Sequence, residues 1–242
     1  MPRMNVQVAL LPRDLVPQSL SKRVVVVFDV LRATTTMTAA LAAGVRDIHV
    51  FGNVATARQR AGSVGMYPKP LLCGEENCLP PEGFDMGNSP GAFDRSLKDR
   101  TLYMSTTNGT RAILAAGDAA LLLTGALVNA SAVAKAAVES GLDLTLLCAG
   151  TNGQVAMEDV LGAGAVLAAV KRLTSVREEG DLPMMALRLF EVEKNDLHGA
   201  LRRTRGGQNV IAAGLEEDID FAASVDRFKV VGKVEGERVV RL

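Results

Sequence analysis

Apolar runs and Ala-rich segments alternate along the first two thirds of the chain. The runs VVVVF and LTLLC lack the polar alternation of a half-exposed strand, so they predict strands that are covered on both faces of a sheet. On this pattern we expect strands at residues 24–29, 47–51, 71–74, 101–105, 119–124 and 143–149. The Ala-rich segments between them predict helices at residues 35–43, 54–64, 109–115, 129–140 and 156–173.

The last third of the chain has a different pattern. Residues 175–183 (SVREEGDLP) indicate a surface loop, and residues 198–214 (HGALRRTRGGQNVIAAG) indicate turns with a short helix. The final residues, FKVVGKVEGERVVRL, alternate around Glu235 and Gly236, which predicts a closing hairpin. We therefore expect a three-layer α/β/α fold with a largely parallel or mixed central sheet and a C-terminal hairpin. No segment has the composition of a linker, so residues 1–242 are expected to form a single domain.

Composition narrows the class of protein. With 48% hydrophobic and 22% charged residues the chain is typical of a folded globular protein. The 27 basic and 27 acidic side chains balance, so no overall field would attract nucleic acid or an anionic membrane. No apolar run approaches the roughly 20 residues of a membrane span. Three cysteines without a CxxC pair, and no signal peptide, lead us to expect a reducing, cytoplasmic location.

Polar residues gather where four of the predicted strands end. The four clusters are DVLRATTT at residues 29–36, the long loop from Gly74 to Pro90, STTNGTR at residues 105–111, and the segment 148–159 with CAGTNG and two acids. The carboxyl ends of parallel strands share one edge of a sheet, and ligands bind outside that edge. Four such clusters therefore predict one binding site at this edge.

The residue types in these clusters suit an anion and a hard metal ion. Asp29 can bind Mg²⁺ or act as a base or nucleophile, and Arg32 can form a fork on a phosphate or carboxylate. The long loop offers oxygen ligands, and STTNGTR combines hydroxyls, a glycine and a helix N-terminus into a candidate oxyanion cradle. Each cluster also has a plainer structural interpretation: an ion pair with a threonine cap, a solvated loop, a capped turn, or acids that favour a helix N-terminus.

Several known mechanisms do not fit these residues. A thiolate phosphatase needs an Arg six residues after its nucleophile, but Gln154 stands six residues after Cys148. The aspartyl-phosphate motif DxDxT is broken because Leu31 takes the place of its second acid. There is no Walker motif, no Arg-His-Gly and no HExxH, and the chain has only two histidines, which disfavours a zinc site. What remains is Mg²⁺-assisted hydrolysis of a phosphoester.

At the four clusters the sequence resembles the 2-phosphosulfolactate phosphatase family of coenzyme M biosynthesis. The resemblance lies in FDVLRATTTMTAAL, GEENCLPPEGFDMGNSP, STTNGTRAI and CAGTNGQVAMEDVLGAG, with a fainter match at GLEEDIDFAASVD. It implies a Mg²⁺-dependent phosphatase that hydrolyses (R)-2-phospho-3-sulfolactate to 3-sulfolactate and phosphate. It also implies an α/β/α fold distinct from the familiar phosphatase folds.

With this resemblance, residues of the clusters receive expected roles. The catalytic candidates are Asp29 and Arg32. The metal-ligand candidates are Asp29, Glu75, Glu158 and Asp159. The substrate-binding candidates are Thr34, Thr35, Asn88, Ser89, Thr107, Asn108, Gly109, Thr110, Arg111, Asn152 and Gly153. Arg202, Arg203 and Arg205 are either a recruiting patch for an anionic substrate or, more plainly, a solvated charged run.

The expected partner is a small anionic phosphomonoester, with neither nucleic acid nor membrane. Two alternatives stay open: a phosphatase for another phosphorylated hydroxy acid, and a non-catalytic binding protein for a small sulfonated or phosphorylated acid. Because small α/β enzymes are often symmetric dimers, a homodimer is the expected form if the chain associates.

Overall fold

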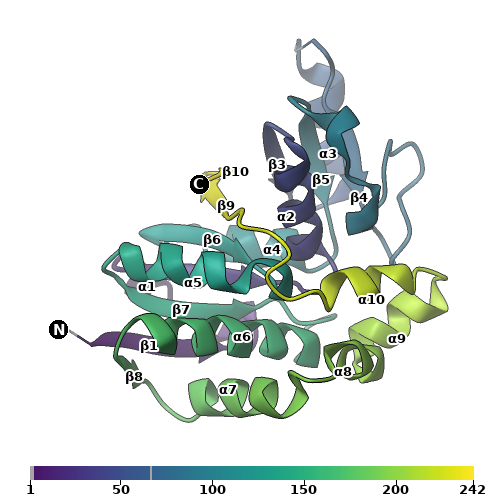
Figure 1. Ribbon diagram of the computed structural model, residues 1–242. Coiled ribbons are helices and arrows are strands. Elements are labelled where there is room, and N and C mark those ends of the chain that lie inside the picture. Colours follow the sequence, from purple (N-terminus) through teal and green to yellow (C-terminus); the bar gives the residue numbers. More distant parts are fainter. Residues whose placement is uncertain (1–2, 66) are drawn as a thin grey trace.

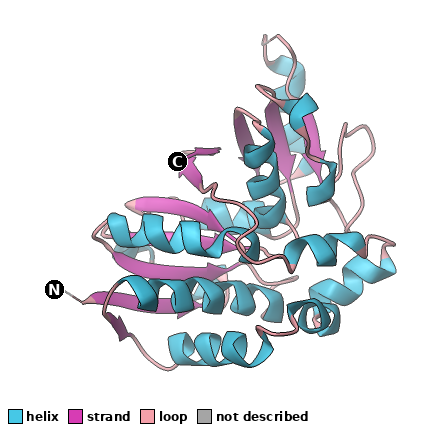
Figure 2. Ribbon diagram, viewed as in Figure 1, coloured by secondary structure: helices cyan, strands magenta, loops and turns pink. Residues whose placement is uncertain are grey.

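Ten strands form one mixed sheet in this computed structural model, which describes residues 3–65 and 67–242 (Figures 1 and 2). The strand order is β4-β5-β3-β10-β9-β6-β2-β7-β1-β8. Neighbouring strands are parallel except at the pairings made by β9 and β10. The predicted α/β class with a mixed, mostly parallel sheet is thereby confirmed.

From β1 to β8, α-helices or 3-10 helices separate consecutive strands along the chain, and α7 to α10 then precede the hairpin of β9 and β10. The strands are β1 (Met4–Ala9), β2 (Arg23–Phe28), β3 (Asp47–Phe51), β4 (Leu71–Gly74), β5 (Thr101–Ser105), β6 (Leu121–Gly125), β7 (Asp143–Cys148), β8 (Val176–Glu178), β9 (Gly232–Glu235) and β10 (Arg238–Arg241). The α-helices are α1 (Pro17–Leu20), α2 (Ala33–Ala43), α3 (Val54–Ser63), α4 (Gly109–Ala115), α5 (Ala130–Glu139), α6 (Met157–Leu173), α7 (Leu182–Glu193), α8 (Leu197–Arg203), α9 (Arg205–Ala212) and α10 (Glu217–Ala222). Short 3-10 helices are η1 (Pro12–Asp14), η2 (Pro90–Ala92), η3 (Arg95–Leu97) and η4 (Leu127–Asn129).

The valine run of β2 is buried on both faces of the sheet. Val24, Val26 and Phe28 pack in a cluster with side chains of α5 and α6. Val25 and Val27 face the other side, where they pack with side chains of α2 and α4. Period-2 alternation in a strand sends neighbouring side chains to opposite faces, so an unbroken apolar run is what a strand between two helical layers requires.

The C-terminal hairpin lies inside the sheet. The turn at Gly236 has a φ of 64°, and β9 pairs with β6 while β10 pairs with β3, both antiparallel. The hairpin itself was predicted, but its place between two groups of parallel strands was not. Figure 1 shows the C-terminus next to β3, between the two groups.

The last third of the chain is more helical than the sequence pattern predicted. Residues 175–183 were expected to be a surface loop, yet they contain the edge strand β8. The segment 198–214 was expected to hold turns and a short helix, and it forms most of α8 and all of α9 instead. Thr204 explains this: its side chain accepts a hydrogen bond from Gly207 N and caps α9 despite the glycines. The strand β1 and the helices α7 and α10 were also not predicted.

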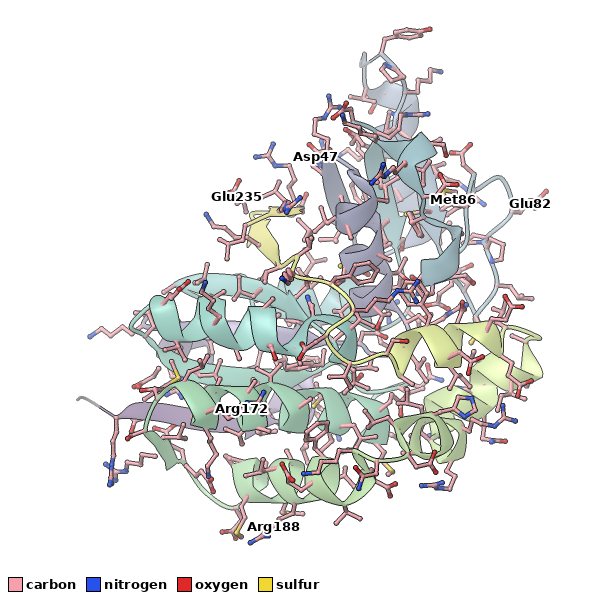
Figure 3. The ribbon with its side chains drawn as sticks, in the orientation of Figure 1. Asp47, Glu82, Met86, Arg172, Arg188 and Glu235 are labelled. Atoms are coloured by element: carbon pink, nitrogen blue, oxygen red, sulfur yellow. The ribbon has the colours of Figure 1, made fainter. Side chains whose placement is uncertain are left out.

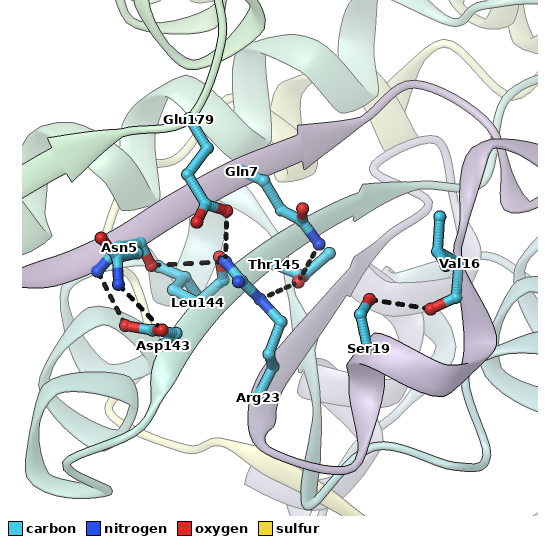
Figure 4. Close-up of polar contacts among 9 residues, drawn as sticks. All are labelled: Asn5, Gln7, Val16, Ser19, Arg23, Asp143, Leu144, Thr145 and Glu179. Carbon is cyan, nitrogen blue, oxygen red and sulfur yellow. Dashed lines mark hydrogen bonds and ion pairs between the residues drawn. The ribbon is translucent and has the colours of Figure 1, made fainter.

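A polar network lies at the amino ends of β1, β2 and β7, so β2 and β7 each have this network at one end and a polar cluster at the other (Figure 4). Arg23, only 8% exposed, donates from Nε to the Thr145 hydroxyl at 2.9 Å and from Nη2 to the Leu144 carbonyl at 2.7 Å. It also pairs with Glu179 at 3.1 Å. This network ties the first, second and seventh strands to the loop after β8.

Across the described chain, no helix is both long enough and apolar enough to cross a bilayer.

Candidate functional site

A cavity of about 420 Å³ lies at the carboxyl ends of β2, β4, β5 and β7, and members of all four polar clusters line it. The expected site residues on its wall are Asp29, Arg32, Glu75, Asn88, Thr107, Asn108 and Asn152. The strands β2 and β7 are parallel neighbours, and so are β4 and β5. Three antiparallel pairings separate the two groups, so the groups run in opposite directions in the sheet. The twist of the sheet across β10 and β9 turns the groups so that the loops after all four strands meet at the cavity (Figure 1).

Asp29 follows β2 directly and is held by the turn into α2. Its Oδ1 accepts a hydrogen bond from Ala33 N at 3.2 Å, while Thr34 N donates to its carbonyl oxygen at 3.0 Å. Gly109, at the first position of α4, lies against Oδ2, which would be 2.7 Å from a Cβ at that residue. Only a glycine at position 109 allows α4 to approach the carboxylate this closely.

The ionised form of Asp29 is disfavoured in the fold. Burial, and then the like charges of Glu75 and Glu158, raise the pKa of Asp29 from 3.8 to about 7. Hydrogen bonds from the backbone of Ala33 and Gly109 oppose this shift. A carboxylic acid with a pKa near neutrality inside a cavity is typical of a functional site.

Glu75 connects two of the clusters. Its Oε1 accepts from Thr107 N at 2.7 Å, and its Oε2 accepts from Cys78 N at 2.9 Å. The carboxylate therefore fixes the loop after β4 to the turn after β5 while it lines the cavity.

The acids Glu158 and Asp159 lie behind the cavity wall and do not line it. Asp159 joins the ends of β2 and β7, since its oxygens accept from Val30 N at 2.8 Å and Gly150 N at 2.9 Å. Glu158 is 1% exposed and packs against Gly206 of α9; its Oε2 has no hydrogen-bond partner within the described ranges. Burial raises the pKa of both carboxyl groups, and the charge of Asp29 adds to the shift of the pKa of Asp159.

Three of the predicted binding residues, Thr34, Thr35 and Thr110, are fully buried and bond to the backbone. Thr34 Oγ1 donates to the carbonyl of Asp29 at 3.0 Å, and Thr35 Oγ1 donates to the carbonyl of Val30 at 2.8 Å. Thr110 Oγ1 donates to Thr106 O at 2.9 Å. In this structure, these three hydroxyls stabilise the turns that present Asp29 and α4, and none of them lines the cavity.

Arg32 lines the cavity but is only 3% exposed, and its guanidinium forms a buried ion pair with Asp218 of α10 at 2.7 Å. Ser89 does not line the cavity; its hydroxyl donates to the same Asp218 oxygen at 2.9 Å. Asn88 is 2% exposed and is held by its own carbonyl, which accepts from Thr36 Oγ1 at 2.7 Å.

The turn after β7 meets the turn after β5. Asn152 N donates to Asn108 Oδ1 at 3.1 Å, and Asn152 adopts a left-handed conformation with a φ of 52°. Gly153 has a φ of 73°, is exposed, and lies outside the cavity wall.

Arg111 lies in a neighbouring cavity of about 330 Å³ and not in the first one. The two cavities share Glu75, Asn77 and Thr107 in their walls. Arg111 is exposed, and its Nε donates to the carbonyl of Gly52 at 3.3 Å.

The outer part of the long loop points away from the site. Figure 3 labels Glu82 at the outer end of this loop, where it is exposed, and Met86 closer to β4. Asp85 Oδ2 accepts from Leu72 N at 2.8 Å, so this acid fastens the loop to the edge strand.

The C-terminal helices supply a wall that the sequence pattern did not predict. Gly206 and Asn209 of α9 line the cavity together with Ala212 and Ala213. The Gly206-Gly207 pair was a signal for close packing, because a Cβ at residue 206 would collide with Glu158. Nothing in the local pattern signalled that Asp218 would meet Arg32.

The basic run beside α9 is engaged with other side chains. Arg202 pairs with Glu216, Arg203 pairs with Glu193 at 2.8 Å, and Arg205 donates to Gln154. Its members are part of the surface network of the C-terminal helices.

The chain is similar to a family of phosphatases over nearly its whole length. The sequence profile described as 2-phosphosulpholactate phosphatase matches residues 10–237. A protein of Caldanaerobacter subterraneus subsp. tengcongensis, named probable 2-phosphosulfolactate phosphatase, is 34% identical over 219 residues, which cover 90% of each chain. Proteins with the same name in Carboxydothermus hydrogenoformans (34% identical, 98% of this chain and 97% of the relative) and Synechococcus sp. strain JA-3-3Ab (39%, 85% and 86%) are similar too.

Proposed function

Because this chain belongs to the 2-phosphosulpholactate phosphatase family, we propose that it hydrolyses (R)-2-phospho-3-sulfolactate to 3-sulfolactate and inorganic phosphate. The observation that carries the proposal is the cavity at the strand ends, where Asp29, Glu75 and Arg32 lie on one wall. The family's named activity needs a site for a phosphate ester, and this cavity is lined by residues of all four clusters.

The charges around the cavity favour a bound cation. The substrate carries a phosphate, a sulfonate and a carboxylate, whereas the wall holds Asp29 and Glu75, and the charge of Arg32 is balanced by Asp218. Such an ester would be repelled by the two carboxylates unless a divalent ion lay between them.

Mg²⁺ fits the donor chemistry of this wall. No group of three or more His, Cys, Asp or Glu side chains forms a closed metal cage within residues 3–65 and 67–242. Mg²⁺ does not need such a cage, because it commonly uses one or two carboxylates together with substrate phosphate and water. We therefore propose Asp29 and Glu75 as its protein ligands. When bound, the ion would neutralise phosphate charge and lower the pKa of a water molecule.

The protein residues would orient the ester around Asp29. This carboxylate is fixed by Ala33 N and by contact with Gly109, so it can act at phosphorus without a conformational search. It would either accept the proton of the attacking water or attack phosphorus itself. Arg32 and the amides of Asn108 and Asn152 would hold phosphate oxygens on the cavity wall.

Arg111 would bind a second anionic group of the substrate. Its cavity adjoins the first, because Glu75, Asn77 and Thr107 line both. The Nε of Arg111 donates to the carbonyl of Gly52, and Glu75 and Glu76 line the same cavity.

The proposal is tested by phosphate release from 2-phosphosulfolactate and from matched esters, such as 2-phospholactate, with Mg²⁺ and with EDTA. We expect the sulfonated ester to be preferred, EDTA to abolish release, and Asp29→Asn to abolish it in a folded protein. Release that is unaffected by EDTA and by Asp29→Asn would refute the assignment of both the ion and the carboxylate. Tight binding of the sulfonated ester with no release would favour a binding protein instead.

A further inference from the structure

The guanidinium of Arg32 is held by three acceptors, two from the long loop after β4 and one from α10. Nη1 donates to Asp218 Oδ2 at 2.7 Å and to the Ser89 hydroxyl at 3.3 Å, and Nη2 donates to the carbonyl of Cys78. Ser89 donates in turn to Asp218 Oδ2, which closes a small ring of hydrogen bonds. The side chains of Arg32 and Asp218 are 2% and 7% exposed.

Asp218 reaches this ring from the other end of the chain. It lies in α10, 186 residues after Arg32, and α10 packs against the η2 segment that follows Ser89. Figure 1 shows α10 next to the loop that follows β4. The ring therefore joins the turn after β2, the long loop and the C-terminal helices at the cavity wall.

A buried ion pair is a poor source of stability, because removing two charges from water costs several kcal/mol. What it does provide is a fixed orientation of the planar guanidinium. Arg has five N–H donors, and the three hydrogen bonds of this ring leave the Nε–H and one Nη2–H without an acceptor within the described chain. Since Arg32 lines the cavity, these two donors remain for a bound anion.

We infer that Asp218 is a positioning residue for this site: it orients Arg32 so that the remaining donors of the guanidinium meet an anionic group of the substrate. The inference rests on the proposed function for the identity of the substrate, but the geometry of the ring does not depend on it. Asp218 acts through Arg32 and does not touch the substrate. Ser89 supports the same carboxylate.

The test compares Asp218→Ala and Asp218→Asn with the wild type in phosphate release from 2-phosphosulfolactate with Mg²⁺. Asp218→Ala should lower kcat/KM by about 10- to 100-fold, mostly through KM, because Arg32 loses its only charged acceptor among the three. Asp218→Asn keeps an acceptor oxygen and should restore part of the loss. Asp220→Asn is the matched control, since Asp220 lies on the same helix, is exposed and pairs with His198; it should leave kcat/KM unchanged.

A double-mutant cycle separates positioning from general support of the fold. If Asp218 acts only through Arg32, the pair Arg32→Ala and Asp218→Ala should be no worse than Arg32→Ala alone, within about threefold. Additive losses would overturn the inference, as would an unchanged or lower KM in a folded Asp218→Ala protein. A lower KM would mean that Asp218 only weakens the charge of Arg32.

Phosphate binding tests the positioning role of Asp218 separately from the proposed phosphatase activity. If the wild type releases no phosphate, the proposed function fails, and binding of inorganic phosphate with Mg²⁺ by calorimetry tests the positioning role instead. Weaker phosphate binding by Asp218→Ala than by Asp220→Asn would then support it, and equal binding would overturn it.

Discussion

Asp29 is an acid in a place where its ionised form is costly. It is 7% exposed and lies near two other carboxylates, while the hydrogen bonds that it accepts come from the backbone and carry no full positive charge. A side chain in such a setting is neutral or needs a cation beside it. Fully buried threonines stabilise the turn that holds it, so the carboxylate has a fixed position. Its charge, in contrast, can change with pH.

At the residue scale, we predict that Asp29 lowers the free energy of unfolding by an amount that depends on pH. Because its pKa is raised from 3.8 to about 7, the folded state holds a proton that the unfolded state has lost, and stability falls as pH rises through this window. The cost above pH 7 is at most about 4 kcal/mol. In EDTA, Asp29→Asn should therefore gain stability over the wild type at pH 8 but not at pH 4, measured by urea unfolding.

The control for this experiment is the exposed Asp118, whose change to Asn should leave the pH dependence as it is. A difference between Asp29→Asn and the wild type that stays constant from pH 4 to pH 8 would contradict the raised pKa.

The cysteines give a second prediction at this scale. Cys73 and Cys148 are fully buried, Cys78 is half-buried, and burial raises the pKa of all three thiols. A chromogenic disulfide reagent at pH 8 should therefore label at most Cys78 in the native protein and all three thiols in urea. Loss of native labelling in Cys78→Ser would confirm the assignment, and rapid labelling of Cys148 would contradict it.

Among the helices, α4 packs directly against Asp29, the proposed catalytic carboxylate. It begins at Gly109, directly against Asp29 and Ala33. A Cβ at Gly109 would lie 2.6 Å from the Cβ of Ala33 and 2.7 Å from Asp29 Oδ2, so α4 or the turn after β2 would have to move. From the sequence, this glycine was placed in a candidate oxyanion cradle, and its close packing against Asp29 was not predicted.

Gly109→Ala should consequently lower kcat/KM by at least about tenfold and cost about 1–3 kcal/mol of stability, as overpacking does. The matched control is Gly62→Ala in α3, where a Cβ would meet nothing within 4 Å. That variant should keep full activity and gain up to about 1 kcal/mol from helix propensity. Equal activity of the two variants would show that the contact with Asp29 is not needed.

The packing of the amino ends of β1, β2 and β7 depends on Arg23. Its removal would leave the carbonyl of Leu144 without its guanidinium donor and break the pair with Glu179 (Figure 4). Arg23→Ala should lower the free energy of unfolding by about 2–3 kcal/mol without changing KM, because the site lies at the other strand ends. Arg172→Ala, at an exposed position of α6 labelled in Figure 3, is the control. A change in KM with unchanged stability would reverse this interpretation.

For the whole molecule, the local sequence pattern predicted the βα units. It did not predict which segments far apart in the sequence pair or pack together. The strands from β2 to β7 and the helices between them follow from apolar runs and Ala-rich segments, because both signals are local. The insertion of β9 and β10 between β6 and β3 depends on pairing over more than 100 residues, which a period-2 pattern cannot report. That residues 1–242 form one domain, in the cytoplasm, stays a prediction.

The candidate site was also predicted only in part: residues that follow strands were found, and residues from the C-terminal helices were not. Asp29, Glu75, Asn108 and Asn152 were predicted to meet because parallel strand ends share one edge. They do line one cavity, but β4 and β5 run antiparallel to β2 and β7, which that argument did not foresee. Their catalytic and binding roles stay predictions. Asp218 and the wall made by α9 come from a segment whose packing is decided by tertiary contacts, such as that between Gly206 and Glu158.

At the scale of the whole molecule, we expect that removal of residues 228–242 prevents folding. Without β9 and β10, the strands β3 and β6 would each present an unpaired edge, and the two groups of parallel strands would lose their connection. We expect the truncated chain to be insoluble or to lack cooperative urea unfolding. A soluble truncated protein with a cooperative transition would contradict this expectation.

Synthesis on the ribosome gives the central hairpin a further consequence. The strands β9 and β10, which fill the middle of the sheet, are translated after the other eight, so the earlier strands cannot complete the sheet until both have left the ribosome. During that interval the nascent polypeptide carries two half-sheets with open sides, the kind of surface that chaperones bind and that aggregation exploits.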